Sequence, residues 1–448
     1  MRPKQQPRAR HDDLFRARLD QIINMKHALV VLADRIDWAW LDEQLADRFS
    51  DQGRPAEPVR FMIGMFLLKH TYGLSDEQVW ERWVHDPYFQ YFTGEEFFQH
   101  TLPHERSGLS HWRKRIGGKL DILLQESLRV AHDTGALKKS DLARVTVDTT
   151  VQPKNIAFPT DAGLLETAIR QLGKLAREHG VTLRQSYARV ARQAAMMAGR
   201  YAHAKQFKRM NRQIKFLRTR LGRIIRDIRR KIDGDEDLKE IFATPLSKAS
   251  QIRGQKRRQR GPKLYSWHAP ETECIGKGKA RAPYEFGTKV SLTTTNRRCK
   301  GGQFILHAKA LPGSPYDGHT LKQVIAETEA LTGREIDRVY VDKGYAGHKT
   351  PRPHRVFKSG QKRGVHGQIK KELRRRSAIE AVIGHCKTDG HLGRNFLKGR
   401  LGDQINAVMS AVGYNLRLIL KWLRLLLHAI ITAIRQAIAT QSALKTAS

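Results

Sequence analysis

The stretch Ala143-Arg144-Val145-Thr146-Val147-Asp148-Thr149-Thr150 is a β-branched run flanked by polar residues, so it predicts a β-strand that carries an aspartate near its end. A second apolar run, Val339-Tyr340-Val341-Asp342, predicts another strand that ends in aspartate. Between the two, residues 288–294 and 304–308 have strand character and 319–331 predict a helix. Because a strand, helix, strand succession implies parallel pairing, the sequence predicts an α/β fold whose sheet is parallel in part.

Helices are expected before this region, over residues 1–135. Pro58 suits the start of a helix that ends at Gly73, and Ser75 can cap a second helix. This arrangement fits a DNA-binding helix-turn-helix, or else a helical hairpin whose role is to pack in the core.

Ser110 is expected to cap a further helix that opens with a cluster of cations. Those cations suit DNA phosphates or else form a solvated helix face, and both interpretations stay open. They are Arg113, Lys114 and Arg115.

A basic helical segment is expected between the first strand and the second. Residues 201–260 hold 19 Lys and Arg against 6 Asp and Glu, while apolar residues from Ile214 to Ile228 keep helical spacing. The segment is therefore an amphipathic helix rather than a tail. We expect its basic face and the loop that follows to hold DNA. The residues proposed for this contact are Arg212, Lys215, Arg218, Lys256, Arg257 and Arg258.

Composition bounds the class of protein. The 448 residues include 82 Lys and Arg against 44 Asp and Glu, a formal net charge of +38, and 40% of them are hydrophobic. Such a chain is too apolar for a disordered polycation, and its charge predicts nucleic acid as the partner. Three scattered cysteines exclude a disulfide scaffold and a CxxC zinc site. We expect a cytoplasmic protein without a membrane span, because charges interrupt the apolar stretch 416–434.

The two strand-end aspartates could carry chemistry. Asp148 and Asp342 would meet at one edge of the sheet, where two carboxylates need a cation between them. Two Mg²⁺ ions about 4 Å apart would meet that need and act on phosphorus. A helix expected over 368–388 offers a third carboxylate, Glu380. At about 100° per residue, Arg376, Glu380 and Lys387 point in directions within about 40° of one another around the helix axis, so they share one face. The alternative is a surface Arg–Glu pair in a chain with many acidic residues.

The same residues resemble a known family. Thr146-Val147-Asp148-Thr149-Thr150, Tyr340-Val341-Asp342-Lys343-Gly344-Tyr345 and the Arg376, Glu380, Lys387 spacing are similar to the Asp-Asp-Glu signature of bacterial insertion-sequence transposases, closest to the insertion-sequence-five family. Further matches are Ala282-Pro283-Tyr284-Glu285-Phe286-Gly287, Asp389-Gly390, the run from Gly393 to Gly399, and Gly413-Tyr414-Asn415. One position departs from the pattern: Leu373 stands where the family has tyrosine, three residues before the arginine.

The resemblance implies an RNase H-like catalytic core, a mixed sheet flanked by helices, with Asp148 on its first strand, Asp342 after its fourth and Glu380 on a following helix. It implies an all-α N-terminal DNA-binding or dimerisation domain at 1–135, a catalytic domain at 136–410 interrupted by a helical insertion at about 155–285, and amphipathic helices at 411–448.

The resemblance also implies an activity. This activity is metal-dependent cleavage of double-stranded DNA at terminal inverted repeats, followed by strand transfer into target DNA. Two Mg²⁺ ions, which Mn²⁺ can replace, would be held by Asp148, Asp342 and Glu380. Phosphate would be neutralised by Arg376 and Lys387. By analogy the protein is a homodimer associated with the bacterial nucleoid. Two alternatives remain: a non-transposing RNase H-like nuclease, and a catalytically inactive DNA-binding repressor derived from such an element.

Overall fold

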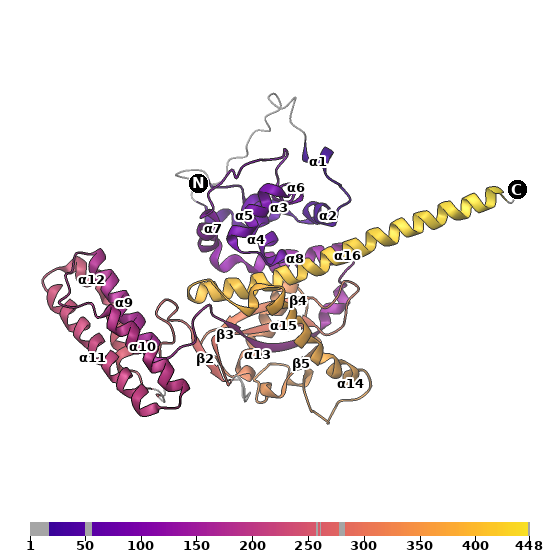
Figure 1. Ribbon diagram of the computed structural model, residues 1–448. Helices are drawn as coiled ribbons and strands as arrows, with labels where there is room; N and C mark the ends of the chain where they lie inside the picture. Colours follow the sequence, from indigo (N-terminus) through magenta and orange to yellow (C-terminus); the bar gives the residue numbers. More distant parts are fainter. Residues whose placement is uncertain (1–17, 50–55, 257–258, 260, 277–282, 447–448) are drawn as a thin grey trace. The chain divides into compact units, whose positions relative to one another are not determined.

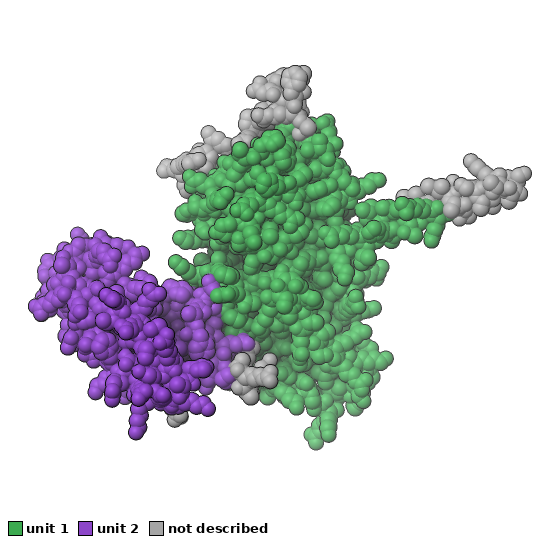
Figure 2. All heavy atoms as spheres, in the orientation of Figure 1, with its two compact units in different colours: residues 1–153, 288–448 green, residues 154–287 purple. Residues whose placement is uncertain are grey.

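The computed structural model describes residues 18–49, 56–256, 259, 261–276 and 283–446. The chain divides into two compact units (Figure 2). Unit 1 combines residues 1–153 with 288–448, and unit 2 is Lys154–Gly287. Each unit has its own hydrophobic core.

Unit 1 is built on a mixed sheet (Figure 1). Its strands in chain order are β1 (Arg144–Pro153), β3 (Tyr284–Thr295, of which the first four residues belong to unit 2), β4 (Ile305–Leu311), β5 (Arg338–Val341) and β6 (Val356–Lys358). They lie side by side as β4-β3-β1-β5-β6. β3 and β4 are antiparallel, whereas β1, β5 and β6 are parallel, so the expected α/β fold with a mixed sheet is confirmed.

The helices of unit 1 fall into a group before the sheet and a group between and after its strands. The first group is α1 (Leu19–Ile22), α2 (Ala28–Arg35), α3 (Trp38–Leu45), α4 (Val59–Tyr72), α5 (Asp76–His85), α6 (Pro87–Thr93), α7 (Gly108–Ile116) and α8 (Asp121–Asp133). The second group is α13 (Asp317–Thr332), α14 (Gly367–Arg374), α15 (Ala378–Thr388) and α16 (Gly399–Thr446).

One continuous core joins the early helices to the sheet. The helix α16 packs against α4, α8 and β4, and buried side chains run without a break from Leu29 through Val145 to Leu420. The boundary expected after residue 135 therefore crosses a shared core, and the one expected after residue 410 falls inside α16. Burial of this apolar surface, rather than helix propensity alone, fixes the helices on the sheet.

Gly413 and Asn415, from the motif Gly413-Tyr414-Asn415, have structural roles in this core. A Cβ built at Gly413 would lie 2.2 Å from the carbonyl oxygen of His70, so only glycine lets α16 pass this close to α4. The Asn415 amide accepts from the backbone N–H of Ile305 (2.9 Å) and donates to its C=O (2.8 Å). Asn415 thereby satisfies both backbone groups of a buried residue on β4.

A buried polar network holds the segment before α16 on the end of β1. The amide of Asn395 donates to Asp403 (2.7 Å), whose other oxygen accepts from the Thr288 hydroxyl (2.8 Å). The Gln152 amide donates to the Asp403 carbonyl (2.9 Å), and the N–H of Asn395 donates to Pro153 (2.8 Å). Since β1 carries Asp148, this network fixes the strand on which the first expected metal ligand lies.

In its described residues, unit 2 is a helical bundle with a short strand that pairs with the start of β3. Its elements are α9 (Asp161–Glu178), α10 (Ala188–His203), α11 (Phe207–Lys231), α12 (Glu236–Gly254) and β2 (Glu273–Gly276). The apolar stripe from Leu217 to Ile228 on α11 is buried against α9, α10 and α12, so the amphipathic helix expected here is confirmed. The charged face of α11 lies outward.

Three local expectations need correction. The helix that carries Trp112 begins at Gly108 with Ser107 at its N-cap, so Ser110 lies inside α7. The segment 351–367 is rich in proline, glycine and cations, a composition that predicts a loop, but it contains β6, a strand of three residues that is too short to show an alternating pattern. The helix expected over 368–388 is interrupted by a 3₁₀ turn at Arg375–Ser377.

None of the helices within the described residues combines the length and apolar character needed to span a membrane.

We predict that Gly413→Ala destabilises unit 1 by about 1–3 kcal/mol or more, because the new methyl group overpacks the contact between α16 and α4. Thermal unfolding followed by circular dichroism measures the change. Gly384→Ala on α15 is the matched control: no described atom lies within 4 Å of a Cβ built there, so the substitution should leave stability equal or higher. Equal losses in both variants would contradict the packing argument.

We also predict that acid destabilises unit 1 through two buried histidines. The rings of His70 and His391 lie 5.1 Å apart. Burial lowers the pKa of His70 well below its ordinary value, with Lys69 and His391 adding to the effect, and burial also lowers the pKa of His391. The pKa values in the folded protein lie below the unfolded value of about 6.5. The folded state is therefore most stable above about pH 6.5, where both histidines are neutral, and it loses stability as the pH falls below about 6.5. The midpoint temperature should drop from pH 7 to pH 5.

His70→Gln should reduce that pH dependence, whereas His203→Gln, at an exposed position on α10, should reproduce the native profile. A native-like acid sensitivity in His70→Gln would assign the effect to other groups.

Candidate active site

Parallel pairing of two strands brings the two aspartates together. The register pairs Arg144 with Arg338 and Thr146 with Tyr340. Continued by two residues, it sets Asp148 on β1 beside Asp342, which directly follows β5. Each carboxylate accepts a 2.8 Å hydrogen bond from the backbone N–H of the next residue through its Oδ1 atom, which fixes the orientation of the carboxylate.

The guanidinium of Arg376 joins all three expected acidic residues. Its nitrogens lie 3.2 Å from Asp148 Oδ2, 3.9 Å from Asp342 Oδ1 and 3.6 Å from Glu380 Oε1. The arginine side chain is only 12% exposed and Asp148 18%, whereas Asp342 and Glu380 are 52% and 69% exposed. Three carboxylates from β1, β5 and α15 therefore meet at the surface around one largely buried cation.

A buried carboxylate, Glu372, fixes the helix that leads to Arg376. Glu372 accepts hydrogen bonds from the Tyr340 hydroxyl and from Arg338 Nε (2.8 Å), and Arg144 lies 3.2 Å away. These partners belong to β5 and β1, so α14 is attached to the two strands that carry the aspartates. The backbone then turns through Arg375–Ser377 before α15 begins.

This 3₁₀ turn changes the expected helical face. Arg376 lies in the turn and not on a continuous helix, so the common face calculated for Arg376, Glu380 and Lys387 does not hold. Glu380 stays close to Arg376, but Lys387 lies seven residues further along α15, about 10 Å away along the axis, and is half-buried.

Burial is the main influence on the protonation of Asp148. It raises the pKa of this carboxyl above the ordinary value, and the negative charge of Asp342 raises it further. The N–H of Thr149 and the Arg376 guanidinium act in the opposite direction. Clustered carboxylates are therefore costly here, and a cation compensates that cost.

Asp317, the first residue of α13, is a site residue that the sequence analysis missed. It accepts hydrogen bonds from the hydroxyl of Thr149 (3.1 Å) and from Lys289 Nζ (3.1 Å). Burial raises the pKa of Tyr345 well above its ordinary value, and the charges of Asp317, Asp148 and Asp342 raise it further. An aspartate in the first turn of a helix is common, and sequence spacing alone does not connect it with Thr149.

The donor set is compatible with a divalent metal ion. Carboxylate oxygens are the ligands that Mg²⁺ prefers. Within the described part of the chain no three His, Cys, Asp or Glu side chains are close enough together to hold a metal ion, because the three acidic residues face the Arg376 side chain and not one another. Two of the acidic residues, Asp342 and Glu380, are more than half exposed, so surrounding atoms leave their side chains room to reorient.

A cationic groove adjoins the carboxylates. Its volume is about 660 Å³, and Arg376 forms part of its wall together with residues of α14 and of the loop after β6. The cations that line it are Lys362, Lys370, Arg374 and Arg376. Leu373, which stands at the tyrosine position of the related pattern, also lines it.

The cations expected to bind DNA through α7 separate into two kinds. Arg113 is buried, with its guanidinium 2.8 Å from Asp76 and beside the Lys69–Asp76 pair, so it stabilises the packing of α7 on α4 and α5 and is unsuited to contact DNA. Lys114 and Arg115 are exposed, and Arg115 lies over the ring of Phe49.

The cations expected in unit 2 separate in the same way. Arg218 donates to the carbonyl of Gln255 (3.0 Å) and so joins α11 to the segment after α12. Arg212, Lys215 and Lys256 are exposed. Arg257 and Arg258 lie outside the described residues.

Two family models match the chain. The Transposase domain (DUF772) matches residues 17–115, and the Transposase DDE domain matches residues 260–416. The second match includes Asp342 and Glu380, whereas Asp148 lies between the two matched segments and is placed by its strand pairing. The DDE domain is RNase H-like, in agreement with β1, β3, β4 and β5 as the first four strands of the core.

Part of the chain is also similar to a protein from a bacterium. The protein described as uncharacterized protein ORF8 in the nfe locus of Rhizobium meliloti is 51% identical over 208 residues, which are 100% of that protein and 46% of this chain. No solved structure matches the chain. With both transposase domains present and the carboxylates gathered at the edge of a mixed sheet, the chain belongs to the bacterial insertion-sequence DDE transposases.

Proposed function

We propose that this transposase binds the terminal inverted repeats of an insertion sequence, cuts the DNA at the ends of the element and joins the freed 3′-hydroxyl to target DNA. The observation that carries the proposal is the convergence of Asp148, Asp342 and Glu380 on Arg376 beside a cationic groove. Acidic groups that hold metal ions and cations that bind phosphate are the two requirements of metal-assisted phosphodiester chemistry.

In this proposal each side chain has a separate task. Asp148, Asp342 and Glu380 would hold two Mg²⁺ or Mn²⁺ ions. Bound metal supplies charge neutralisation at the phosphate and lowers the pKa of water, so that the attacking oxygen is available at neutral pH. Arg376 offsets the repulsion among the carboxylates and, with Lys387, neutralises phosphate near the bond that breaks.

The exposed cations support DNA as the substrate. The groove lined by Lys362, Lys370 and Arg374 leads to the carboxylates and suits one DNA strand. Further contacts would come from Lys114 and Arg115 on α7 and from Arg212, Lys215 and Lys256 in unit 2. Arg257 and Arg258 remain candidates from sequence alone. Binding through so many cations should weaken steeply with salt.

The C-terminal part of α16 supports a homodimer. Leu416, Leu420 and Leu423 are buried in the core of unit 1. Beyond them, Leu425, Ile430 and Ile431 are exposed. Exposed apolar side chains along one helix favour pairing with a second chain, and transposition brings two element ends together. Such a dimer would act on the bacterial nucleoid in the cytoplasm.

We predict that Glu380→Gln lowers metal-dependent cleavage at least about 100-fold, because the variant loses one carboxylate of the metal site. The assay uses a labelled duplex that carries the junctions between the element and its flanking DNA, with Mg²⁺ or Mn²⁺. Asp133→Asn, an exposed acid on α8, is the charge-matched control and should cut at the native rate.

The outcomes of this assay separate the candidate functions. Full activity in Glu380→Gln would refute the assignment of the third ligand. If the native protein binds confirmed element ends but does not cut them, the inactive repressor becomes the better hypothesis. Cutting without joining to a supercoiled plasmid would indicate the non-transposing nuclease.

We further predict that Asp317→Asn slows cleavage about 10- to 100-fold while DNA affinity stays unchanged. The substitution weakens the bonds from Thr149 and Lys289 that position the strand next to Asp148. Glu327→Gln is a close control, because Glu327 lies on the same helix and also pairs with a strand lysine, Lys309, on β4. A comparable loss of rate in both variants would show that α13 is merely destabilised.

A further inference from the structure

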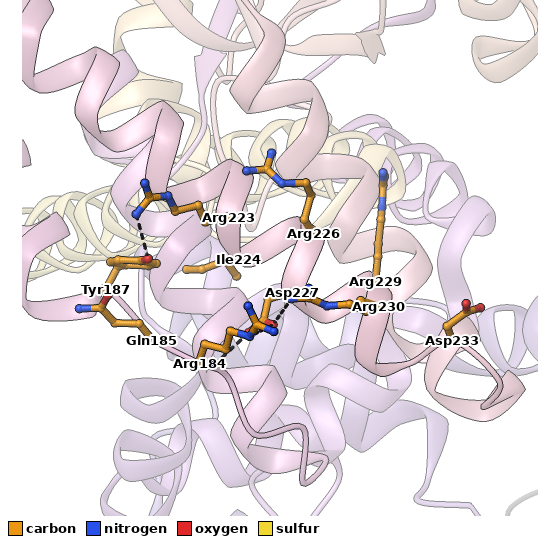
Figure 3. A pocket seen from close by; sticks show the side chains of 10 residues that line it. All are labelled: Arg184, Gln185, Tyr187, Arg223, Ile224, Arg226, Asp227, Arg229, Arg230 and Asp233. Carbon is orange, nitrogen blue, oxygen red and sulfur yellow. Dashed lines mark hydrogen bonds and ion pairs between the residues drawn. The ribbon is translucent and has the colours of Figure 1, made fainter.

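Unit 2 contains a cavity of about 830 Å³ that lies outside the residues proposed above for DNA contact. It is lined by the segment before α10 and by one face of α11 (Figure 3). Five arginines line it against two aspartates: Arg184, Arg223, Arg226, Arg229 and Arg230, with Asp227 and Asp233. We propose that this cavity is a binding site for the phosphate backbone of duplex DNA, an inference that rests on the proposed function and adds a site to it.

Asp227 organises the arginines and is itself neutralised. Its carboxylate is buried and accepts from the backbone N–H of Arg184 (2.9 Å) and from Arg230 (2.9 Å), with Lys231 3.5 Å away. This carboxylate attaches the loop at Arg184 to α11, so the wall of the cavity is held in place before any ligand arrives. Asp233, the other aspartate, lies 3.6 Å from Lys239.

Three of the arginines have no carboxylate partner among the described residues. Arg223 donates to the hydroxyl of Tyr187 (3.4 Å) and Arg229 to that of Ser250 (3.4 Å), and these partners are neutral. Figure 3 shows the guanidinium groups of Arg223, Arg226 and Arg229 on the same side of the helix, while Arg184 and Arg230 turn toward Asp227. All three are exposed, so a polyanion can reach them.

The spacing of the arginines fits a DNA strand. Arg223, Arg226 and Arg229 are each three residues apart, so their side chains are spread over about 9 Å along α11. Successive phosphates of one strand advance about 3.4 Å along the duplex axis, so this length spans about three of them. Arg220 continues the same surface, stacked over the ring of Phe216 at 4.1 Å. Guanidinium groups bind phosphate oxygens in pairs, which suits arginine over lysine here.

The test measures binding alone, in EDTA, so that cleavage cannot affect the result. Fluorescence anisotropy with a labelled 40-base-pair duplex gives the Kd across a series of salt concentrations. Arg223→Gln/Arg226→Gln should weaken binding at least about tenfold at 100 mM salt and lower the slope of log Kd against log salt by about 2, one for each phosphate contact. Arg223→Lys/Arg226→Lys, which keeps both charges, should keep the native slope.

Arg170→Gln/Lys174→Gln on α9 is the matched control, because it removes the same charge from exposed positions of the same unit. The control should lose less than about threefold in affinity. Equal losses of affinity in the two double variants would overturn the proposal, because they would show that only the overall charge of the unit matters. Native affinity in both double variants would also overturn it. Duplex RNA of the same length is the competing ligand. The assignment of DNA would be overturned if the RNA bound more tightly than the DNA and if Arg223→Gln/Arg226→Gln weakened RNA binding but not DNA binding.

These outcomes are separable from the catalytic proposal. A protein that cuts element ends while Arg223→Gln/Arg226→Gln binds DNA normally refutes the cavity and leaves the transposase function intact. A protein that binds through the cavity but never cuts refutes only the catalytic proposal. Circular dichroism melting of both double variants confirms that unit 2 stays folded during the comparison.

Discussion

The parallel pairing of β1 with β5 is the constraint on which the candidate active site depends. These strands are almost 200 residues apart in the chain, and their register sets Asp148 beside Asp342. Around this pair the other elements act as supports. The network at Asp403 holds the end of β1, Asp317 accepts from the residue next to Asp148, and Glu372 attaches α14 to both strands. Each support is a buried or half-buried hydrogen-bonded carboxylate, which is costly to disturb.

Arg376 explains how three carboxylates can converge before any metal is bound. Burial and the negative charge of Asp342 both raise the pKa of Asp148, because both disfavour its charged form. A guanidinium between them offsets both effects. Its donors reach the acidic residues at 3.2 to 3.9 Å, which keeps the carboxylates near their expected positions while leaving Asp342 and Glu380 exposed. The same cation adjoins the groove proposed for DNA, so one residue links the acidic edge with the phosphate path.

The large positive charge of this chain serves two different purposes. Some arginines are internal: Arg113 pairs with buried Asp76, and Arg218 bonds a backbone carbonyl within unit 2. Others, such as Arg223 and Arg226, are exposed without a carboxylate partner among the described residues. Charge counting does not separate these groups, because an arginine carries the same charge whether its partner is an aspartate of the protein or a phosphate of DNA.

The sequence by itself determined the family and the main elements that carry the candidate site. Local patterns were sufficient for the strands that hold Asp148 and Asp342, for the amphipathic helix α11 and for the family resemblance, because each depends on residues close together in the chain. Only the tertiary structure decided the rest. It placed Arg376 in a 3₁₀ turn and not on a helical face, buried Arg113, and brought Asp317 to Thr149 across 168 residues. The Gly413-Tyr414-Asn415 motif likewise gained a reason only from its neighbours, His70 on α4 and Ile305 on β4. Contacts between distant segments arise when helices and strands share a core, and a linear pattern contains no record of which surfaces meet.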